Sequence, residues 1–441
     1  MPPLAWLLIP LLLAACGRSS APSSSAAGAP SLASQAPSAG PPRPSRAIAP
    51  AIGAVMTWPD GRRVAVRYKG WDTTDFGRFR TYAYGDARPE VPVASVTVPD
   101  GPPGDAAKGR ALFVSRARGP CTGCHLVPGA DVWPAGNVGP DLSTVGDRGL
   151  TDGYLYQLVF DPRPIFPKTV MPPWGATGVL TPGEVRDVVA YLQTLKGPRP
   201  AETDPERDPA TRRRPVGFGD NLDATNNPGV LLADQAEAEW STKGPADRAC
   251  ADCHVGPPEL AMKGVAARYP RHVASQGRVM SVEDWLTVHG PETTGAAYLA
   301  ESEANLRMTV LIKMASNGLP VAIDTTSPEG RAALARGRAS FERRVGQRNH
   351  ACADCHTPDG GANHFLGGRM LADVREGLTR HFPTWRTSQS ELWDLRKRFQ
   401  WCMTPLGANM LAADAVEYAE LELYLTSFDV GKPMSVPGIR H

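Results

Sequence analysis

Three copies of the pattern C-x-x-C-H carry the clearest chemistry in the sequence, because this pattern is the attachment signature of c-type haem. In each copy the two cysteines form thioethers to the porphyrin, and the adjacent histidine takes the proximal position on iron. A single copy could be half of a zinc site, but three copies that each close on histidine argue against zinc. The sequence therefore predicts three covalently bound haem c groups, attached through Cys121 and Cys124, Cys250 and Cys253, and Cys352 and Cys355, with His125, His254 and His356 as proximal iron ligands.

A methionine in a proline-rich loop is the candidate distal ligand of the first haem. Met171 lies in the stretch Lys168-Thr169-Val170-Met171-Pro172-Pro173, just before a predicted helix. Methionine is more often a core side chain, but this loop position favours iron ligation. A His/Met pair raises the reduction potential, so we expect the first haem to accept electrons readily.

Cys402 has no cysteine partner, and its spacing from the third C-x-x-C-H unit gives it a role. Met171 follows His125 by 46 residues, and Cys402 follows His356 by the same 46. Cys402 thus occupies the position where the first unit presents its methionine, and a thiolate there lowers the potential of the haem. The alternative is a buried free cysteine beside a solvated basic turn, against which the spacing argues. Three basic residues before it favour the thiolate and could hold a dianion: Arg396, Lys397 and Arg398.

The distal ligand of the second haem stays open on spacing alone, because no methionine or cysteine lies at a matching offset from His254. Four residues are candidates: Met262, His272, Met280 and His289.

The first fifty residues predict export and a membrane anchor. The apolar run that ends in Leu13-Ala14-Ala15-Cys16 is too short to span a bilayer and resembles the lipobox of bacterial lipoproteins, so we expect Cys16 to be lipidated. The alternative is an ordinary signal peptide with an incidental cysteine. Residues 17–50 are almost entirely Ala, Ser, Pro and Gly, which predicts a flexible tether. The expected location is therefore periplasmic or extracytoplasmic, an oxidising compartment.

The charge composition indicates which classes of partner to expect. The 47 basic and 45 acidic residues leave a net charge of +2, which gives no electrostatic footprint for nucleic acid or for an acidic membrane surface. We therefore expect contact with a membrane only through the lipid anchor, and no nucleic acid partner.

Helical patterns surround the haem motifs. We expect helices over residues 108–116, from a capping box at Thr181-Pro182-Gly183-Glu184, over 302–317, from Ser327-Pro328 to Phe341, and over 414–427. Gly109 and Phe113 before the first haem recur as Gly337 and Phe341 before the third, which predicts close approach of another helix at each glycine and packing on each phenylalanine.

These patterns predict a mainly α protein with three class I cytochrome c-like haem domains in tandem and a small strand-containing extension with runs at 63–68 and 93–98. The expected parts are a signal peptide 1–16, the tether 17–50, the extension 51–103, haem domains 104–197, 226–325 and 326–441, and a linker 198–225.

Several motifs resemble a known cytochrome. Residues 104–197 are similar to SoxX, and residues 230–440 are similar to SoxA, so the chain resembles a single-polypeptide fusion of the two SoxAX subunits. The SoxX-like motifs include Gly139-Pro140-Asp141-Leu142-Ser143 and Met171-Pro172-Pro173. The SoxA-like motifs include Gly346-Gln347-Arg348-Asn349, Phe382-Pro383-Thr384-Trp385-Arg386 and Arg398-Phe399-Gln400-Trp401-Cys402.

The resemblance implies an L-cysteine S-thiosulfotransferase. Such an enzyme joins thiosulfate oxidatively to a cysteine of the carrier protein SoxYZ, and two electrons leave through the haems to a small external cytochrome c. The resemblance also implies that His356 and Cys402 ligate the active-site haem, that Cys402 can carry an extra sulfur, and that Arg398 is the active-site arginine. Lys397 is a further candidate beside it.

One departure from the family concerns the second haem. Related dihaem SoxA proteins ligate it with a second cysteine, and the corresponding position here is His289, which predicts a His254/His289 pair. Two other functions remain open: a thiosulfate dehydrogenase that forms tetrathionate, and a plain multihaem electron carrier in which Cys402 is structural.

Overall fold

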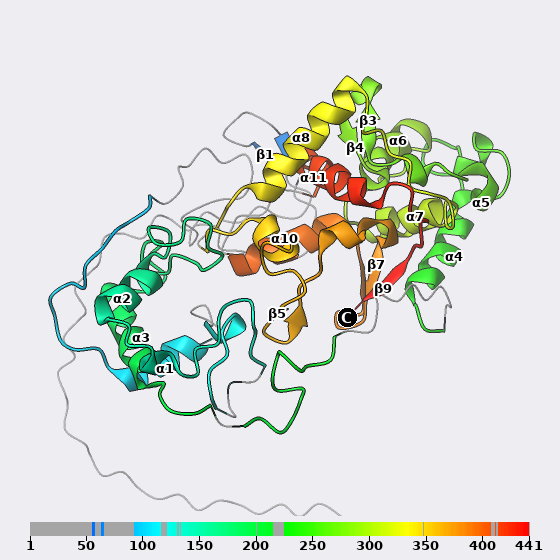
Figure 1. Cartoon of the computed structure of the whole chain (residues 1–441). Helices are drawn as coiled ribbons and strands as arrows, with labels where there is room; N and C mark the ends of the chain where they lie inside the picture. The colour runs from blue at the N-terminus through cyan, green and yellow to red at the C-terminus, as the bar shows by residue number, and fades with distance from the viewer. Residues whose placement is uncertain are drawn as a thin grey trace, which may run out of the picture. The chain divides into compact units, whose positions relative to one another are not determined.

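The computed structural model is rich in helices and holds only short strands, as expected for cytochrome c domains (Figure 1). It describes residues 55–57, 63–65, 92–115, 121–129, 132, 134–199, 201–214, 225–346, 348–406, 411 and 413–440. Cys16 and the predicted tether lie outside these ranges. Among the described residues, no helix combines the length and the apolar character needed to cross a membrane.

Three helices enclose the core of the first predicted haem domain: α1 (Ala106–Val114), α2 (Asp152–Phe160) and α3 (Pro182–Thr194). The predicted capping box at the start of α3 is confirmed, because the Glu184 amide donates to Thr181 Oγ1 and the Thr181 amide donates to Glu184 Oε2. The apolar face of α3 is buried in this core through Val185 and Val188. The first domain therefore closes as its helical pattern predicts.

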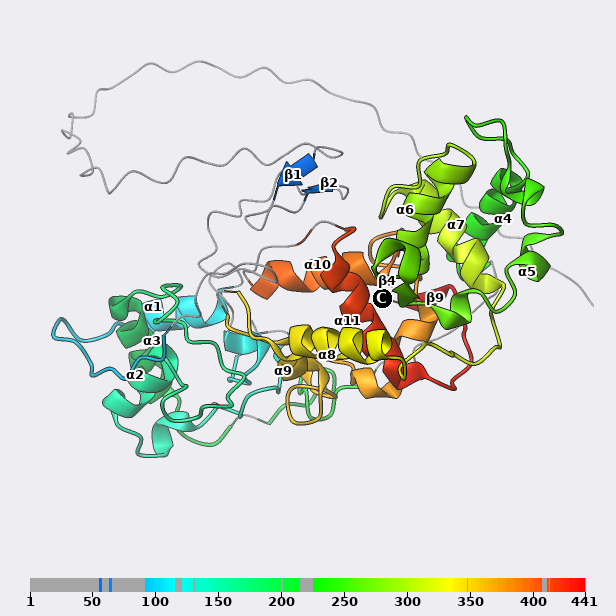
Figure 2. The same cartoon turned by 90° about the horizontal axis from the view of Figure 1, so that it is seen from above.

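The repeated glycines mark two close helix crossings. A Cβ at Gly109 of α1 would lie 1.8 Å from the Asp187 carbonyl oxygen of α3. Likewise, a Cβ at Gly337 of α8 (Pro328–Glu342) would lie 2.1 Å from the Glu420 carbonyl oxygen of α11 (Val416–Thr426). Figure 2 shows α8 alongside α11. Only glycine permits these backbones to meet, so the predicted close approach is confirmed.

The repeated phenylalanines pack on the helices that these crossings bring near. The ring of Phe113 lies edge-on to Tyr191 with centroids 5.5 Å apart, and the ring of Phe341 lies 5.4 Å from that of Tyr424. Both phenylalanines are almost fully buried. The two units thus share one packing solution for their first and last helices.

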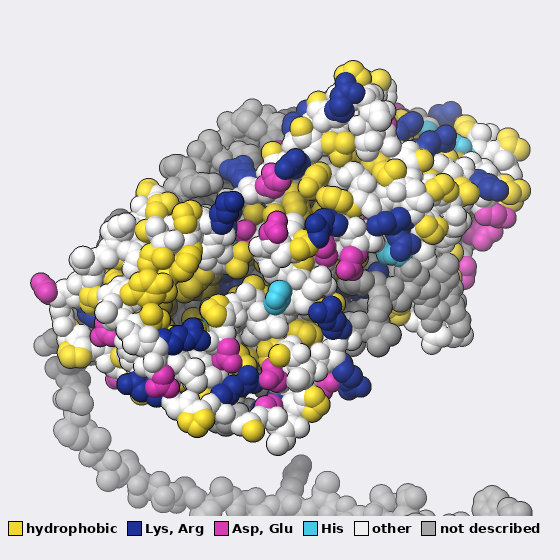
Figure 3. All heavy atoms as spheres, in the orientation of Figure 1, with side chains coloured by type: hydrophobic (Ala, Val, Ile, Leu, Met, Phe, Trp, Pro, Cys, Tyr) yellow, Lys and Arg dark blue, Asp and Glu magenta, His cyan; other side chains and the backbone are white. Residues whose placement is uncertain are grey.

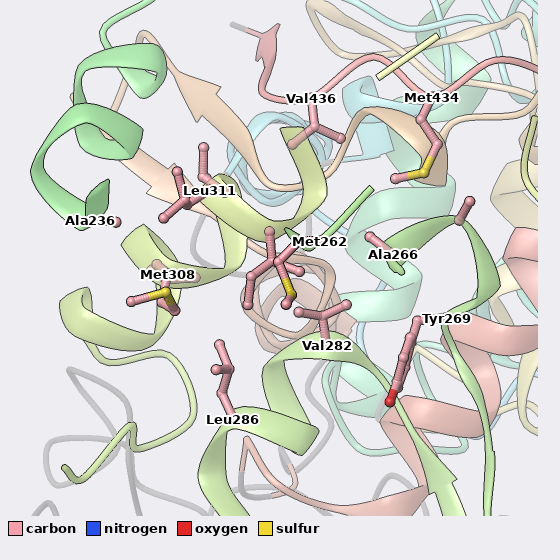
Figure 4. Close-up of a cluster of buried hydrophobic side chains, with 14 of the residues drawn as sticks. Ala236, Met262, Ala266, Tyr269, Val282, Leu286, Met308, Leu311, Met434 and Val436 are labelled. Carbon is pink, nitrogen blue, oxygen red and sulfur yellow. The ribbon is translucent and has the colours of Figure 1, made fainter. Parts of the chain in front are cut away.

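The second predicted haem domain is built from α4 (Gly229–Trp240), α5 (Pro258–Ala261), α6 (Val282–Thr293) and α7 (Glu303–Met314), with a hairpin of β3 (Arg271–Val273) and β4 (Arg278–Met280). Figure 4 shows side chains from α4, α6 and α7 converging on a shared interior, with Met262 among them. Ser302 accepts from the Asn305 amide and caps α7, which lies within the helix predicted over 302–317.

The third predicted haem domain adds α9 (Cys352–His356) and α10 (Leu395–Leu406) to α8 and α11. A three-stranded sheet places β7 (Thr384–Arg386) between antiparallel β8 (Glu391–Trp393) and parallel β9 (Gly438–Arg440). A second hairpin pairs β5 (Phe365–Leu366) with β6 (Arg369–Met370). Short 3₁₀ turns connect the elements: η3 (Cys121–Gly123), η4 (Val145–Asp147), η5 (Cys250–Asp252), η6 (Ala266–Arg268), η7 (Ala274–Gln276), η8 (Val374–Glu376), η9 (Thr379–His381) and η10 (Ser427–Asp429).

The described residues of the N-terminal extension bear out only part of its strand prediction. A hairpin of β1 (Val55–Thr57) and β2 (Arg63–Ala65) is present, but the strand prediction for residues 93–98 is wrong. There the Ala94 amide donates to Asp161 Oδ2 and the Val96 amide donates to Gln157 Oε1. The backbone amides of this extended segment are therefore paired with side chains of α2 and of the residue that follows it, and not with another strand.

Surface charge is mixed on the face seen in Figure 3. Basic and acidic side chains are interspersed there, and apolar side chains gather over the α1–α3 unit. This distribution agrees with the nearly balanced charge of the sequence.

Helix α10 begins above buried charges. Arg396 is fully buried and donates to Asp284 Oδ2 at 2.6 Å and to Glu422 Oε2 at 3.0 Å. Burial raises the pKa of Asp394 to about 6, against the opposing charge of Arg396. Asp394 also accepts from the Lys397 amide in the first turn of α10. The start of this helix is therefore anchored to a cluster whose protonation affects stability.

Because the pKa of Asp394 is raised in the folded state, its contribution to stability is lost as pH rises from about 4 to about 6. We expect Asp394→Asn to match the wild type at pH 4 and to exceed its free energy of unfolding at pH 8 by on the order of 1–3 kcal/mol. Thermal unfolding at the two pH values measures this. Asp234→Asn, on the exposed side of α4, is the control for a lost charge. An equal effect of Asp394→Asn at both pH values would contradict the prediction.

Candidate active site

His125 of the first unit has its ring fixed by the backbone that follows it. Its Nδ1 lies 2.8 Å from the Pro140 carbonyl oxygen, so Nδ1–H donates and Nε2 keeps its lone pair for a metal. Glycine is required at position 139, because a Cβ there would lie 2.4 Å from His125 Cε1. Burial lowers the pKa of His125 and favours the neutral ring that metal ligation needs. The geometry fits a proximal haem ligand.

His356 of the third unit is held in the same way. Its Nδ1 lies 2.8 Å from the Ala372 carbonyl oxygen, 16 residues later, where the first unit uses a carbonyl 15 residues later. The Nε2 atom of His356 is therefore also left for a metal. This shared second-shell bond extends the repeat beyond the helices to the ligand itself.

Cys402 lies on α10, and its thiol makes a hydrogen bond with the His356 side chain. Burial by itself raises the pKa of a thiol, but Arg398, His356 and Arg386 together lower the pKa of Cys402 to about 7. A large thiolate fraction at neutral pH follows. The structure thus brings together the histidine and the cysteine that the sequence spacing pairs.

Met171 and Cys402 lie at the same spacing from their histidines, but in different local structures. Met171 lies in a loop, where its amide donates to Thr169 Oγ1 at 3.0 Å, and its side chain packs against the first core. Cys402, by contrast, lies within a helix. A helix presents its sulfur more rigidly than a loop does, which suits a group that must stay aligned during covalent chemistry.

Of the three basic residues before Cys402, two have other partners. Arg396 forms the buried ion pairs described above, and Lys397 Nζ lies 2.7 Å from Glu391 Oε2 and 5.5 Å from the centroid of the Trp393 ring. Arg398 is the group that lowers the pKa of the Cys402 thiol most. Consecutive residues on a helix point in different directions, so the three basic side chains are not equivalent at this site.

The charges of two arginines from different elements lower the pKa of the Cys402 thiol: Arg398, one turn earlier on α10, and Arg386, at the end of β7. Within the described ranges, Arg398 Nη1 and Arg386 Nε are buried without a hydrogen-bond acceptor. Burial and the nearby charges of Arg398 and Arg369 lower the pKa of Arg386 to about 10. Buried cationic donors that lack an acceptor beside a thiolate form a site that fits an anion.

Two tryptophans hold these cations in place. The Arg398 and Arg369 guanidinium carbons lie 4.9 Å and 4.6 Å from the centroid of the Trp401 ring, and that of Arg386 lies 5.5 Å from the Trp393 ring centroid. Trp401 is partly exposed, so one side of this cluster meets solvent. Such contacts offset the repulsion between arginines and leave their N–H groups available.

The sequence reasoning missed Arg386 and Arg369 as members of this site. Arg386 ends the motif Phe382-Pro383-Thr384-Trp385-Arg386, to which the sequence alone attaches no role. The position of Arg386 is set by the pairing of β7 within its sheet. One partner strand in that sheet is β9, from the end of the chain. A contact made through strands so far apart in sequence has no local signal.

His254 and His289 of the second unit face each other. Their ring centroids lie 6.0 Å apart, and Trp285 stacks on His289 at 5.3 Å. A metal bonded to one nitrogen of each ring holds the ring centres about 6 Å apart, given metal–nitrogen bonds of about 2 Å. The two residues therefore fit the two axial positions of one haem.

The other candidate ligands of the second haem are placed elsewhere. Met262 and Met280 are buried, and Met262 belongs to the apolar core of Figure 4. His272 lies on β3, opposite Val279. His289, whose ring faces that of His254, is therefore the best-placed candidate.

Three C-x-x-C-H units, two of them with the same backbone bond to histidine, define a multihaem c-type cytochrome. The SoxA/TsdA cytochrome c domain model matches residues 235–321 and 336–434, and the model for cbb3-type cytochrome c oxidase subunit III matches residues 104–192. Cytochrome c domains carry covalently bound haem c, which is the cofactor of this chain.

Curated relatives narrow the class to a family. The chain is 31% identical over 221 residues to the L-cysteine S-thiosulfotransferase subunit SoxA of Pseudaminobacter salicylatoxidans, which covers 49% of this chain and 75% of that subunit. The SoxA subunit of Rhodovulum sulfidophilum is 29% identical, with 50% and 75% covered. The crystal structure of SoxXA from P. pantotrophus is 27% identical, covers 49% of this chain and 80% of that chain, and has a TM-score of 0.45.

The chain belongs to the SoxA family of L-cysteine S-thiosulfotransferases. A further, SoxX-like cytochrome c domain precedes the SoxA region on the same polypeptide.

Proposed function

We propose that this protein joins thiosulfate oxidatively to a cysteine of a SoxYZ-type carrier protein, with Cys402 as the residue on which the sulfur is handled. The observation that carries the proposal is the meeting of a low-pKa thiol with two buried arginine donors that lack an acceptor. A thiolate can form a covalent sulfur intermediate, and the arginines match the charge of a dianion. Neither feature is needed in a plain electron carrier.

The ligand sets fit three haem c groups. His125 and Met171, His254 and His289, and His356 and Cys402 would hold the three irons, and the six C-x-x-C-H cysteines would attach the porphyrins. When bound, the haems accept electrons one at a time and polarise the ligating sulfur. His/Met ligation gives a higher potential than His/thiolate, so electrons should pass from the third site toward the first.

The reaction divides into two sulfur steps. First, Arg398 and Arg386 hold the thiosulfate dianion so that its terminal sulfur meets the Cys402 thiolate, and an S–S bond forms with release of two electrons. Second, the carrier thiolate attacks the terminal thiosulfate sulfur, the bond to Cys402 breaks, and Cys402 leaves as a thiolate. The carrier thus gains an S-thiosulfonate, its thiol loses one proton, and two equivalents of a small cytochrome c take one electron each.

The first fifty residues would determine where the enzyme is located. Lipidation of Cys16 would place the enzyme in the periplasm or another extracytoplasmic space, held at a bacterial membrane by the anchor alone. Residues 17–50 would let the haem domains reach a carrier and an electron acceptor away from the membrane surface.

The test is to weigh the carrier. Purified holoprotein is incubated with thiosulfate, oxidised cytochrome c and a carrier with a C-terminal cysteine. We expect the carrier mass to rise by one thiosulfate group while two electrons appear on the cytochrome c. Free tetrathionate without a carrier adduct would favour the thiosulfate dehydrogenase function. If thiosulfate does not react at all, electron transfer would be the remaining function.

Arg386→Gln should weaken substrate binding more than it changes the haems. The variant keeps a polar side chain on β7 but removes a cation near the Cys402 sulfur. We expect KM for thiosulfate to rise about tenfold or more, because charge-assisted bonds to a dianion contribute about 1.5–3 kcal/mol each. Steady-state kinetics measure this, with Arg338→Gln on the exposed side of α8 as a matched control. An unchanged KM would remove Arg386 from the site.

A further inference from the structure

The segment that leads into the third haem attachment motif contacts the loop that carries Met171. Three of its side chains reach that loop at three separate points. His350 Nε2 donates to the Val170 carbonyl oxygen, the Arg348 guanidinium carbon lies 5.6 Å from the Trp174 ring centroid, and Arg344 Nη2 donates to the Lys168 carbonyl oxygen at 3.4 Å.

The segment is itself rigidly held. The His350 amide donates to the Val345 carbonyl oxygen and the Val345 amide donates back, which closes a tight hairpin. Gly346 and Asn349 supply left-handed backbone at φ of 75° and 51° within it. These are conformations that glycine and asparagine tolerate best. His350 therefore stands on a fixed turn.

The hairpin is also tied to the haem motif that follows it. Arg344 pairs with Asp354, the third residue of the C-x-x-C-H unit, at 3.0 Å. Asp354 Oδ2 in turn accepts from the Ala351 amide at 2.9 Å. A shift of the third attachment site would therefore move the side chains that touch the Met171 loop.

His350 is well suited to hold a carbonyl. It is almost fully buried, and burial lowers its pKa, so the ring is neutral and carries one N–H. The Val170 carbonyl is the acceptor for that N–H and belongs to the residue directly before Met171. Fixing this peptide group fixes the direction in which the Met171 side chain leaves the backbone.

We propose that His350, in the third haem domain, is a positioning residue for the distal ligand of the first haem, Met171. The hydrogen bond to Val170 and the contacts of Arg344 and Arg348 hold the loop in its ligating conformation. The two domains between which electrons pass are thus coupled through a ligand loop. This inference rests on the proposed ligation of Met171 and is independent of the chemistry at Cys402.

The test uses the full-length holoprotein and a signal specific to the first haem. Methionine-ligated ferric haem gives a charge-transfer band in the near infrared, and Met171→Ala shows how much of the band this residue supplies. We expect His350→Phe, which keeps a ring but removes the N–H, to lose most of the band and to lower the first haem's reduction potential. His350→Gln, which can still donate, should retain both.

A second histidine provides the control. His364 lies in the same domain, and its Nδ1 makes a local hydrogen bond with the Ala362 carbonyl oxygen. His364→Phe should therefore leave the band unchanged. Arg344→Met should weaken the band in the same direction as His350→Phe, by a smaller amount. Unchanged signals from the third haem in every variant would show that the domain is folded.

Two results would overturn the proposal, and they differ. If Met171→Ala loses the band while His350→Phe keeps both band and potential, the loop is held without His350. If Met171→Ala keeps the band, Met171 is not the ligand and the inference fails with that assignment. Neither result affects the carrier assay, so the proposed transferase function stands or falls separately.

Discussion

Cys402→Ala is expected to abolish transfer of thiosulfate to the carrier, with turnover falling by about three orders of magnitude or more. The reason is that the Cys402 sulfur is the atom to which the thiosulfate sulfur is bonded in the proposed reaction. Carrier mass and cytochrome c reduction measure the loss. The spectra of the first and second haems should not change, because their predicted ligands lie elsewhere.

Cys402→Met separates two roles of the same sulfur. A thioether can still ligate iron, but it cannot form a disulfide with thiosulfate. We expect this variant to keep a six-coordinate low-spin third haem and to be as inactive as Cys402→Ala. Substantial turnover by Cys402→Met would show that the sulfur acts only as a ligand.

Gly337→Ala should destabilise the third domain, although alanine is the better helix former by about 1 kcal/mol. The added Cβ would lie 2.1 Å from the Glu420 carbonyl oxygen, and the obstacle is backbone, which cannot rotate away. Helices α8 and α11 would have to separate, and the packing of Phe341 on Tyr424 would loosen with them. We expect a loss of about 2–4 kcal/mol in the free energy of unfolding.

Gly153→Ala is the matched control for this change. Gly153 lies on helix α2, and a Cβ there meets nothing within 4 Å. The substitution should therefore be neutral or stabilise the first domain by up to about 1 kcal/mol. Denaturant unfolding of the two variants measures the difference. If Gly337→Ala were as harmless as Gly153→Ala, the close crossing of α8 and α11 would be wrong.

Local patterns predicted much of the framework, because their physical causes are local. Thr181 and Glu184 lie within one helical turn, so their capping box is visible in the sequence and present in the structure. A glycine and a phenylalanine one turn apart similarly predicted the close helix crossings at Gly109 and Gly337. The strand prediction for 93–98 was wrong, since backbone amides there donate to side chains of the α2 region instead of to a strand.

The anion site was only partly predictable, because side-chain direction depends on tertiary structure. Three consecutive basic residues before Cys402 look equivalent in sequence, yet Arg396 and Lys397 are paired with acids, whereas Arg398 lowers the pKa of the thiol most. Arg386 arrives on a strand that pairs with the end of the chain. The contact between His350 and Val170 spans 180 residues and has no local signal either.

The most direct test is the mass of the peptide that contains Cys402 after the holoprotein has reacted with thiosulfate and oxidised cytochrome c without a carrier. We predict a thiosulfate adduct on Cys402, which disappears when the carrier is added as the carrier gains the same mass. Arg398→Met should reduce the adduct, because the guanidinium that lowers the pKa of the thiol is gone. A Cys402 that stays unmodified while the carrier is still conjugated would contradict the role of Cys402 as the sulfur carrier.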